Sequence, residues 1–367
     1  IMPSLVGAEM GIRDSVDPRL TAKVARTTWQ DIVDAAEQFN SPGHFTTFVA
    51  YEYTATPNMP KIHRNVIFRN ATVPSPPISY ADQPSAVGLW RDLRSQCIDA
   101  GTGCDVLAIP HNSNLSNGHM FAIEYGEAKT KQEQAEIARL RASMEPVVEM
   151  SQMKGDSECR NGMWNVLGAT DELCDFEKMR APDTPDCEGG TGEGALGGDG
   201  CVSRRDFVRY ALAEGLAEAE RIGVNPFQFG FIAATDGHDG LPGPVEEWRQ
   251  DLILGAPIPT PGRNLGGLAA VWAEENTRDS IFAGMKRREA YATSGPRIAL
   301  RFFAGWDFDD AIIDESNPVA IATEGGVPMG DVLTPGDEQS ESPTFFVWAL
   351  ADWMSAPLQR IQVGKGW

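Results

Sequence analysis

The sequence predicts an α/β protein in which parallel strands alternate with covering helices, followed by a small β-rich appendage. Short, continuously apolar runs alternate with helix-patterned segments up to about residue 290. Such strands are typical of parallel sheets that are covered by helices on both faces. Beyond residue 290, two apolar runs follow each other without a helical pattern between them. We therefore expect a β/α domain over residues 1–290 and an appendage over residues 291–367, and a chain of 367 residues is long enough for both.

The individual elements follow from local patterns along the chain. Apolar positions at helical spacing predict helices over 20–39, 85–100, 127–144 and 205–222. Short runs rich in β-branched and aromatic residues predict strands over 45–51, 65–68, 105–109, 146–148 and 229–234. The appendage strands are expected over 298–303 and 344–350.

Composition excludes several classes of function. Asp and Glu number 52 against 31 Lys and Arg, which gives a formal charge of −21. Such a surface repels a polyphosphate backbone, so we expect no nucleic-acid partner. A small anionic substrate stays compatible with this charge, because a bound metal reverses the field locally. No apolar run is long enough to span a bilayer, and neither a P-loop nor a G-x-S-x-G motif occurs.

The six cysteines occur as three pairs of sequence neighbours: Cys97 with Cys104, Cys159 with Cys174, and Cys187 with Cys201. The intervals between them are rich in Gly, Asp and Asn and resemble loops closed by local disulfides. We expect these three disulfides, and with them a periplasmic or secreted protein. The alternative from the sequence is six buried free thiols in a cytosolic protein.

Ionisable side chains collect where the predicted strands end. Glu52 follows the first strand, His111 and Asn112 follow the strand over 105–109, and Glu149 follows the strand over 146–148. The strand over 229–234 leads into Asp236 and His238. Functional groups of parallel β/α barrels lie at such strand ends, so we expect these side chains to converge on one site.

The residue types indicate a site for transition metals. Carboxylates combined with neutral imidazoles suit Zn²⁺, Mn²⁺ or Fe. Asp236 and His238 are spaced to serve one metal or to bridge two, and closely spaced metals could hold and activate a phosphate ester. His63 precedes the strand over 65–68 and is expected either as a ligand or as a contact to ligands or substrate. Glu149 is expected as a ligand, with pairing to an arginine as the alternative.

Cationic side chains flank the predicted ligands. Arg64 and Lys154, with Glu158 nearby, either form salt bridges or hold a substrate anion. We expect Arg64, Lys154 and Asn112 to contact the substrate.

Several motifs together resemble the bacterial domain-of-unknown-function family 3604, which is related to the polymerase-and-histidinol-phosphatase (PHP) superfamily of metal-dependent phosphoesterases. They are FVAYEYT at 48–54, HRNVIFR at 63–69, LAIPHNSNLS at 107–116, QMKGDSE at 152–158, TDGH at 235–238, ENTR at 275–278 and RREAYAT at 287–293. The resemblance implies a distorted (β/α)7 barrel with two or three divalent metals, usually zinc, manganese or iron. Glu52, His111, Asp236 and His238 match the superfamily's ligand positions. Glu149 matches a position that varies, and His63 is typical of the narrower family.

One part of the superfamily pattern is absent. Members open with a strand ending in His-x-His and carry a later Asp-His pair, and this sequence has neither. Because a barrel without its first strands exposes sheet edges, we expect a separate N-terminal fragment to complete it non-covalently. The alternative is a degenerate member of the superfamily.

The sequence therefore predicts a metal-dependent hydrolase that acts on a small anionic substrate, a phosphate ester, by attack of a metal-bound hydroxide at the barrel mouth. Two alternatives remain. The same metal site could cleave a sulfate ester, a phosphonate or an amide, because a fold does not name its substrate. A degenerate, non-catalytic binding module is the other.

Overall fold

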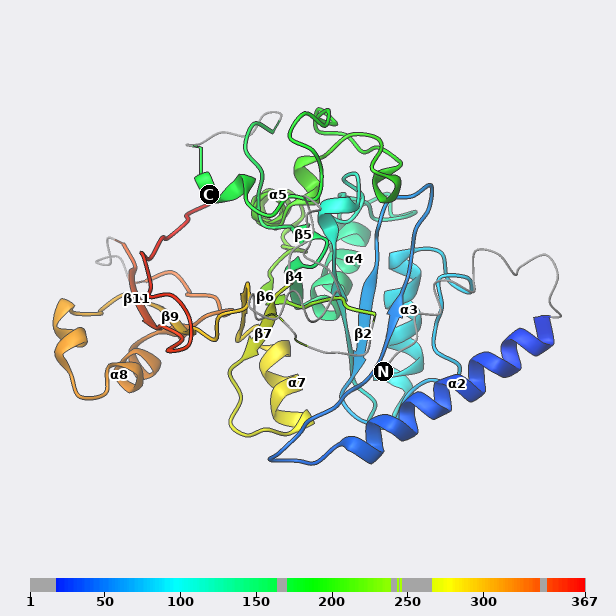
Figure 1. The fold of residues 1–367 in the computed structure, drawn as a ribbon, viewed down its shortest axis with the longest axis horizontal. Coiled ribbons are helices and arrows are strands. Elements are labelled where there is room, and N and C mark those ends of the chain that lie inside the picture. Colours follow the sequence, from blue (N-terminus) through cyan, green and yellow to red (C-terminus); the bar gives the residue numbers. More distant parts are fainter. Residues whose placement is uncertain are drawn as a thin grey trace.

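The computed structural model describes residues 18–163, 170–238, 243, 245, 266–336 and 342–366. Within them the protein is a mixed α/β structure of small sheets with flanking helices (Figure 1). The prediction of an α/β fold is thus confirmed. The described strands do not close into a barrel; they form an arc, because β3 lies beside β4 and β6 lies beside β8.

The first sheet has the order β1-β2-β3, with strands Val49–Tyr53, Arg64–Phe68 and Val106–Pro110. Both neighbouring pairs are antiparallel, so the expectation of a parallel arrangement is wrong here. Ten residues without a helix connect β1 to β2, which is too short a path for a parallel crossover. Since β2 runs opposite to both neighbours, β1 and β3 point the same way, and their ends meet the start of β2.

The second sheet has the order β5-β4-β6, with strands Gly155–Asp156, Val147–Gln152 and Gly230–Ala233. The β4–β6 pair is parallel, as predicted, and helix α5 (Val208–Ile222) lies in the connection between them. Strands β7 (Leu268–Val271) and β8 (Ala290–Thr293) form an antiparallel pair that the sequence patterns did not predict as strands.

All four predicted helices are present with shifted ends. They are α2 (Pro18–Phe39), α3 (Ala86–Gln96), α4 (Lys131–Met144) and α5. Polar caps set the starts: the Ser85 side chain accepts a hydrogen bond from the backbone of Gly88, and Thr130 forms a capping box with Glu133. Gly223, with φ of 77°, ends α5 in the left-handed conformation that glycine adopts at low cost. Helix α7 (Arg278–Lys286) was not predicted.

The appendage forms a sheet of its own, with the order β10-β9-β11 and strands Val327–Pro328, Ala299–Gly305 and Thr344–Leu350. Helix α8 (Pro318–Gly325) lies between β9 and β11 in the chain, so the expectation of strands without an intervening helix is wrong. The helix begins at Pro318, since proline is well suited to the first turn of a helix, and it ends before Gly326. This sheet lies to one side of the arc (Figure 1).

All six cysteines are paired, and the three pairs are those predicted: Cys97–Cys104, Cys159–Cys174 and Cys187–Cys201. The second and third disulfides lie in an irregular segment between β5 and α5, where 3-10 turns at Glu172–Asp175, Ala195–Gly197 and Arg204–Asp206 are the regular elements. No helix among the described residues has the length and apolar character that crossing a membrane requires.

Breaking the Cys187–Cys201 disulfide is expected to destabilise this segment. The bond closes a loop with a sequence separation of 14 residues, and removing a constraint of that size costs about 3 kcal/mol of unfolding free energy. Urea denaturation of a Cys187→Ala/Cys201→Ala variant measures the loss, with Cys97→Ala/Cys104→Ala as the comparison because its shorter loop predicts a smaller effect. An equal or larger loss in the comparison variant would contradict the loop-length argument.

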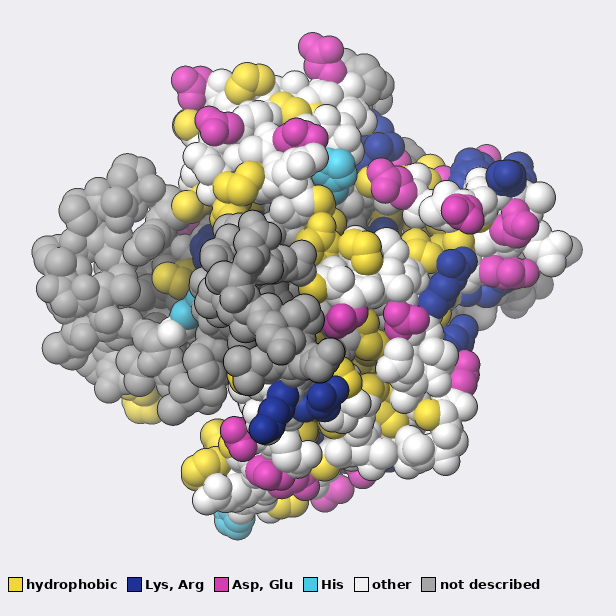
Figure 2. All heavy atoms as spheres, turned by 90° about the vertical axis from the view of Figure 1, so that its right-hand side faces the viewer, with side chains coloured by type: hydrophobic (Ala, Val, Ile, Leu, Met, Phe, Trp, Pro, Cys, Tyr) yellow, Lys and Arg dark blue, Asp and Glu magenta, His cyan; other side chains and the backbone are white. Residues whose placement is uncertain are grey.

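Charged side chains of both signs lie on the surface of the protein (Figure 2). Acidic and basic side chains are interspersed on the described part of the face in Figure 2, and the described atoms there form no continuous basic patch.

Candidate metal centre

The pairing of the first sheet brings three predicted ligands together. Glu52 lies near the end of β1, His63 directly precedes β2, and His111 directly follows β3. Glu52 of β1 is paired with Asn65 of β2. The β2–β3 pairing ends at Arg64 and Pro110, and His63 and His111 are the next residues beyond it. There the His111 N–H donates to the His63 carbonyl (3.3 Å). Side chains alternate between the two faces of a strand, so Glu52, His63 and His111 share one face.

These three side chains form a compact, buried cluster. Nδ1 of His63 and Nε2 of His111 both donate to Oε1 of Glu52, at 2.7 and 3.2 Å. The side chains of His63 and His111 are 8% and 2% exposed, and that of Glu52 is 22% exposed. One potential ligand atom from each residue lies within 4.8 Å of the others. Solvent therefore reaches the cluster through the carboxylate.

The electrostatics keep the carboxylate ionised and one imidazole neutral. Burial raises the pKa of Glu52, but hydrogen bonds from His111 and His63 outweigh burial and hold this pKa well below its usual range. Burial lowers the pKa of His63 to about 4, although the hydrogen bond to Glu52 acts against it. An ionised carboxylate next to a neutral imidazole is the form in which both groups bind metals.

Glu149 lies in β4 beside this cluster. It is 2% exposed, and its Oε1 accepts a hydrogen bond from the backbone N–H of Asn112 (2.9 Å). Burial raises the pKa of Glu149 to about 7, against the opposing effects of the His111 charge and the Asn112 hydrogen bond. Glu149 thus interacts electrostatically with the cluster and also fixes the backbone that follows His111.

Asp236 follows β6 and is bound to a lysine. Nζ of Lys154 forms an ion pair with Oδ2 of Asp236, and Nε2 of Gln152 donates to the same oxygen (2.9 Å). Burial raises the pKa of Asp236, but the charges of Lys154 and His111 outweigh burial and lower it. Nε2 of His238 lies 3.4 Å from Oδ1 of Asp236, and the His238 side chain is 49% exposed. Asp236 and His238 therefore lie together at the exposed rim of the site.

Lys61 is a buried cation that the sequence patterns did not single out. Its Nζ donates to Oδ1 of Asn112 (2.9 Å), and the residue is 6% exposed. Burial lowers the pKa of Lys61 to about 8, and the charge of Lys154 acts in the same direction. The charges of Asp236, Glu52 and Glu149 oppose this, so Lys61 belongs to the same electrostatic neighbourhood. The sequence signal that could have identified Lys61 is its position two residues before His63, which places both side chains on the same face of an extended chain.

Arg64 lies on the other face of the sheet, away from the cluster, because it neighbours His63 in the chain. It is 2% exposed, and its Nε donates to Oε1 of Glu145 (2.7 Å). Arg141 donates to the other Glu145 oxygen (3.0 Å), and Trp90 Nε1 donates to Oε1 (2.9 Å). Arg64 therefore belongs to a buried network around Glu145, and it does not lie with the predicted metal ligands.

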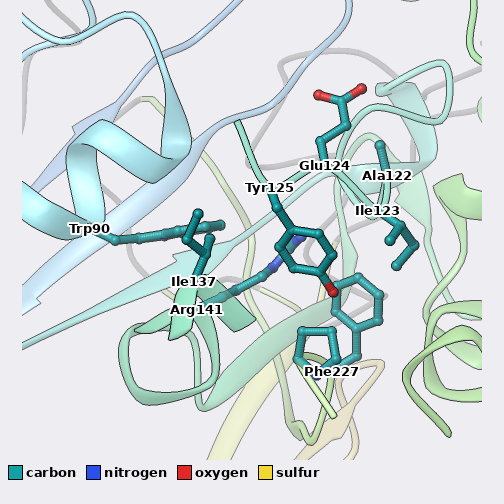
Figure 3. A pocket seen from close by; sticks show the side chains of 9 residues that line it. Trp90, Ala122, Ile123, Glu124, Tyr125, Ile137, Arg141 and Phe227 are labelled. Carbon is teal, nitrogen blue, oxygen red and sulfur yellow. The ribbon is translucent and has the colours of Figure 1, made fainter. Parts of the chain in front are cut away.

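A small cavity borders this network (Figure 3). The Arg141 guanidinium lies 5.3 Å from the centre of the Trp90 ring and 4.5 Å from that of Phe227, so two aromatic faces partly compensate the buried charge. The lining includes Tyr125 and Ile137 but none of the predicted metal ligands. The cavity therefore belongs to the packing of α3 and α4 and not to the candidate metal centre.

The donor set of the cluster fits a divalent transition metal. Two imidazoles and a carboxylate provide the mixed nitrogen and oxygen ligands that Zn²⁺, Mn²⁺ and Fe prefer. Nε2 of His63 and Nδ1 of His111 are buried without a hydrogen-bond partner among the described residues. Buried polar atoms are normally satisfied, and the exceptions indicate a missing ligand, water or ion.

One protein-family model matches most of the chain. The model described as "Protein of unknown function (DUF3604)" matches residues 8–250 and 259–367. The chain belongs to this DUF3604 family. No curated protein and no solved structure matches the chain.

For this DUF3604 member, the raised pKa of His111 leads to a prediction about metal affinity. Burial alone would lower this pKa, but the Glu52 hydrogen bond and the charges of Glu149, Glu52 and Asp236 outweigh burial and raise it. Metal binding requires a neutral imidazole, so a metal must displace the His111 proton below this pKa. We expect the apparent affinity to fall about tenfold for each pH unit of acidification below it. A chelator competition between pH 5.5 and 8 measures this; a constant affinity would contradict it.

Proposed function

We propose that the protein is a metal-dependent hydrolase of phosphate esters. The observation that carries the proposal is the buried cluster of Glu52, His63 and His111, whose donors fit a divalent transition metal. A divalent ion there would supply Lewis acidity, which polarises the ester and makes a bound water more acidic at neutral pH. Zinc, manganese and iron are the metals that this donor set suits.

The surrounding residues have separate roles in this proposal. Glu52, His63 and His111 would hold one metal. Asp236, His238 and Glu149 are assigned to further metal positions, since a second or third ion would neutralise the carboxylates that crowd the site. Asp236 and Glu52 both contribute to the charge environment of His111, which supports a shared centre.

Lys154 is assigned to the substrate phosphate. Its side chain is 25% exposed, and its ammonium group pairs with Asp236 at the rim. An ammonium group at this place can turn from Asp236 to an incoming phosphate oxygen, which would orient the ester towards the cluster. Asn112, held through its backbone by Glu149, is the second substrate contact in this proposal.

We also propose that the protein has a barrel-like fold and that it lies in an oxidising compartment. The arc of strands is consistent with part of a distorted (β/α)7 barrel, and the appendage sheet of β9, β10 and β11 lies outside it. Three disulfides support a periplasmic or secreted protein, because such bonds persist in oxidising compartments.

Metal analysis combined with an ester panel tests the proposed function. The purified chain is reconstituted separately with Zn²⁺, Mn²⁺ and Fe²⁺, and bound metal is counted by mass spectrometry of the digested protein. Hydrolysis is then followed with 4-nitrophenyl phosphate, bis(4-nitrophenyl) phosphate and 4-nitrophenyl sulfate. We expect stoichiometric metal and turnover of a phosphate ester. Bound metal with cleavage of the sulfate alone would transfer the proposal to another ester class, and absence of any bound metal would overturn it.

One observation favours a second candidate function, a non-catalytic binding module. The Lys154 ammonium group pairs with Asp236, a predicted ligand, and thereby occupies a carboxylate oxygen that a metal would need. In that case the protein would bind an anion without cleaving it. Anion binding without turnover in every metal-loaded form would support this candidate.

A further inference from the structure

Lys61 is a buried ammonium group that forms no direct ion pair with any described residue, although the carboxylates of Asp236, Glu52 and Glu149 belong to its electrostatic neighbourhood. Its Nζ has three hydrogens to donate, and its hydrogen-bond acceptor in the described part of the chain is the neutral Oδ1 of Asn112 (2.9 Å). No described Asp or Glu forms an ion pair with it. Leaving a buried charge uncompensated is costly, so such a group is normally paired with an anion.

A network of amides connects Lys61 to the second lysine of the site. Nδ2 of Asn112 donates to Oδ1 of Asn114 (2.6 Å), and Nδ2 of Asn114 donates to the backbone carbonyl of Lys154 (3.0 Å). Asn112 has the left-handed φ of 56°, an uncommon conformation for a residue other than glycine.

We propose that Lys61 and Lys154 form a two-cation subsite for the terminal phosphate of a monoester. This inference rests on the proposed function and narrows its substrate class. A phosphate monoester carries a charge of about −1.5 to −2 at pH 7, whereas a diester carries one negative charge. Two ammonium groups matched to two anionic oxygens therefore favour the monoester.

The reaction is balanced with water as the co-substrate. The water oxygen forms a bond to phosphorus, and the ester bond between phosphorus and the alcohol oxygen breaks. One proton of the water leaves on the alcohol, and the other stays on the hydrogen phosphate product. Lys61 and Lys154 remain protonated and hold the phosphate oxygens throughout.

The test compares Lys61→Met with wild type in the metal-loaded full chain. We expect the affinity for inorganic phosphate, measured by calorimetry, to fall about 10- to 100-fold. The kcat/KM for 4-nitrophenyl phosphate should fall by a similar factor, mainly through KM, with less change for bis(4-nitrophenyl) phosphate. Lys61→Arg should recover part of the phosphate affinity. The exposed Lys131→Met is the matched control and should match wild type.

A second measurement needs no variant. Metal-loaded wild type should bind inorganic phosphate at least about tenfold more tightly than dimethyl phosphate, which has a single negative charge. Equal affinities, or unchanged phosphate affinity in a metal-loaded and folded Lys61→Met variant, would overturn the subsite and leave the proposed function standing. If wild type hydrolyses no ester, the proposed function fails. The phosphate-binding comparison then still tests the subsite by itself.

Discussion

Replacing Glu52 by glutamine is expected to abolish metal binding at the candidate centre and with it phosphate ester hydrolysis. Oε1 of Glu52 accepts hydrogen bonds from both His63 and His111, so this carboxylate is the common point of the cluster. The amide has nearly the same shape but no charge. Replacing residues that merely support a ligand costs 10–100-fold in metal affinity, so loss of a ligand should cost more than about 100-fold.

Metal content and turnover are measured side by side for the Glu52→Gln variant. Glu124→Gln is the matched control, since Glu124 is an exposed glutamate at the edge of the cavity in Figure 3 and not among the predicted ligands. The control should retain both properties. Full metal occupancy and normal turnover in Glu52→Gln would contradict the assignment of the centre.

Replacing Glu145 by alanine is expected to cause the largest loss of stability. Glu145 is fully buried, and it accepts hydrogen bonds from Arg64, Arg141 and Trp90. Its removal leaves two buried guanidinium groups without a counter-charge, which destabilises a protein by about 3–5 kcal/mol. Urea denaturation of Glu145→Ala measures the loss, and Glu136→Ala on the exposed face of α4 should lose far less.

A triple replacement separates the cost of a broken network from the value of the network itself. Arg64→Met, Arg141→Met and Glu145→Leu together remove all three charges and leave apolar side chains of similar length. We expect this variant to be more stable than Glu145→Ala, because a well-packed apolar group can replace a buried ion pair at little cost. A triple variant less stable than Glu145→Ala would show that packing, and not the unpaired charges, dominates.

The sequence predicted the elements of this fold better than their pairing. Apolar spacing located α3 and α4, and short apolar runs located β2 and β3, because periodicity reports which side chains are buried. Strand direction depends on the connections, and the helix-free path between β1 and β2 requires an antiparallel turn. Helix α8 was missed because its eight residues are too few to show a clear helical periodicity.

The sequence predicted part of the candidate centre from parallel strand ends, whereas the structure assembles the centre through antiparallel pairing. His63 was separated from the strand-end pattern, yet antiparallel pairing places the start of β2 beside the ends of β1 and β3, and therefore His63 beside Glu52. Arg64 was expected near the substrate, but alternation along β2 turns it to the opposite face. Lys61 was missed because its burial depends on contacts with the distant Asn112.

Anomalous X-ray scattering at the zinc, iron and manganese edges, measured on crystals of the reconstituted protein, tests the central claim most directly. It reports the position and the element of a bound metal together. We expect an anomalous peak in coordination contact with Glu52, His63 and His111. A peak located elsewhere with none at these three residues, or no peak after reconstitution, would contradict it.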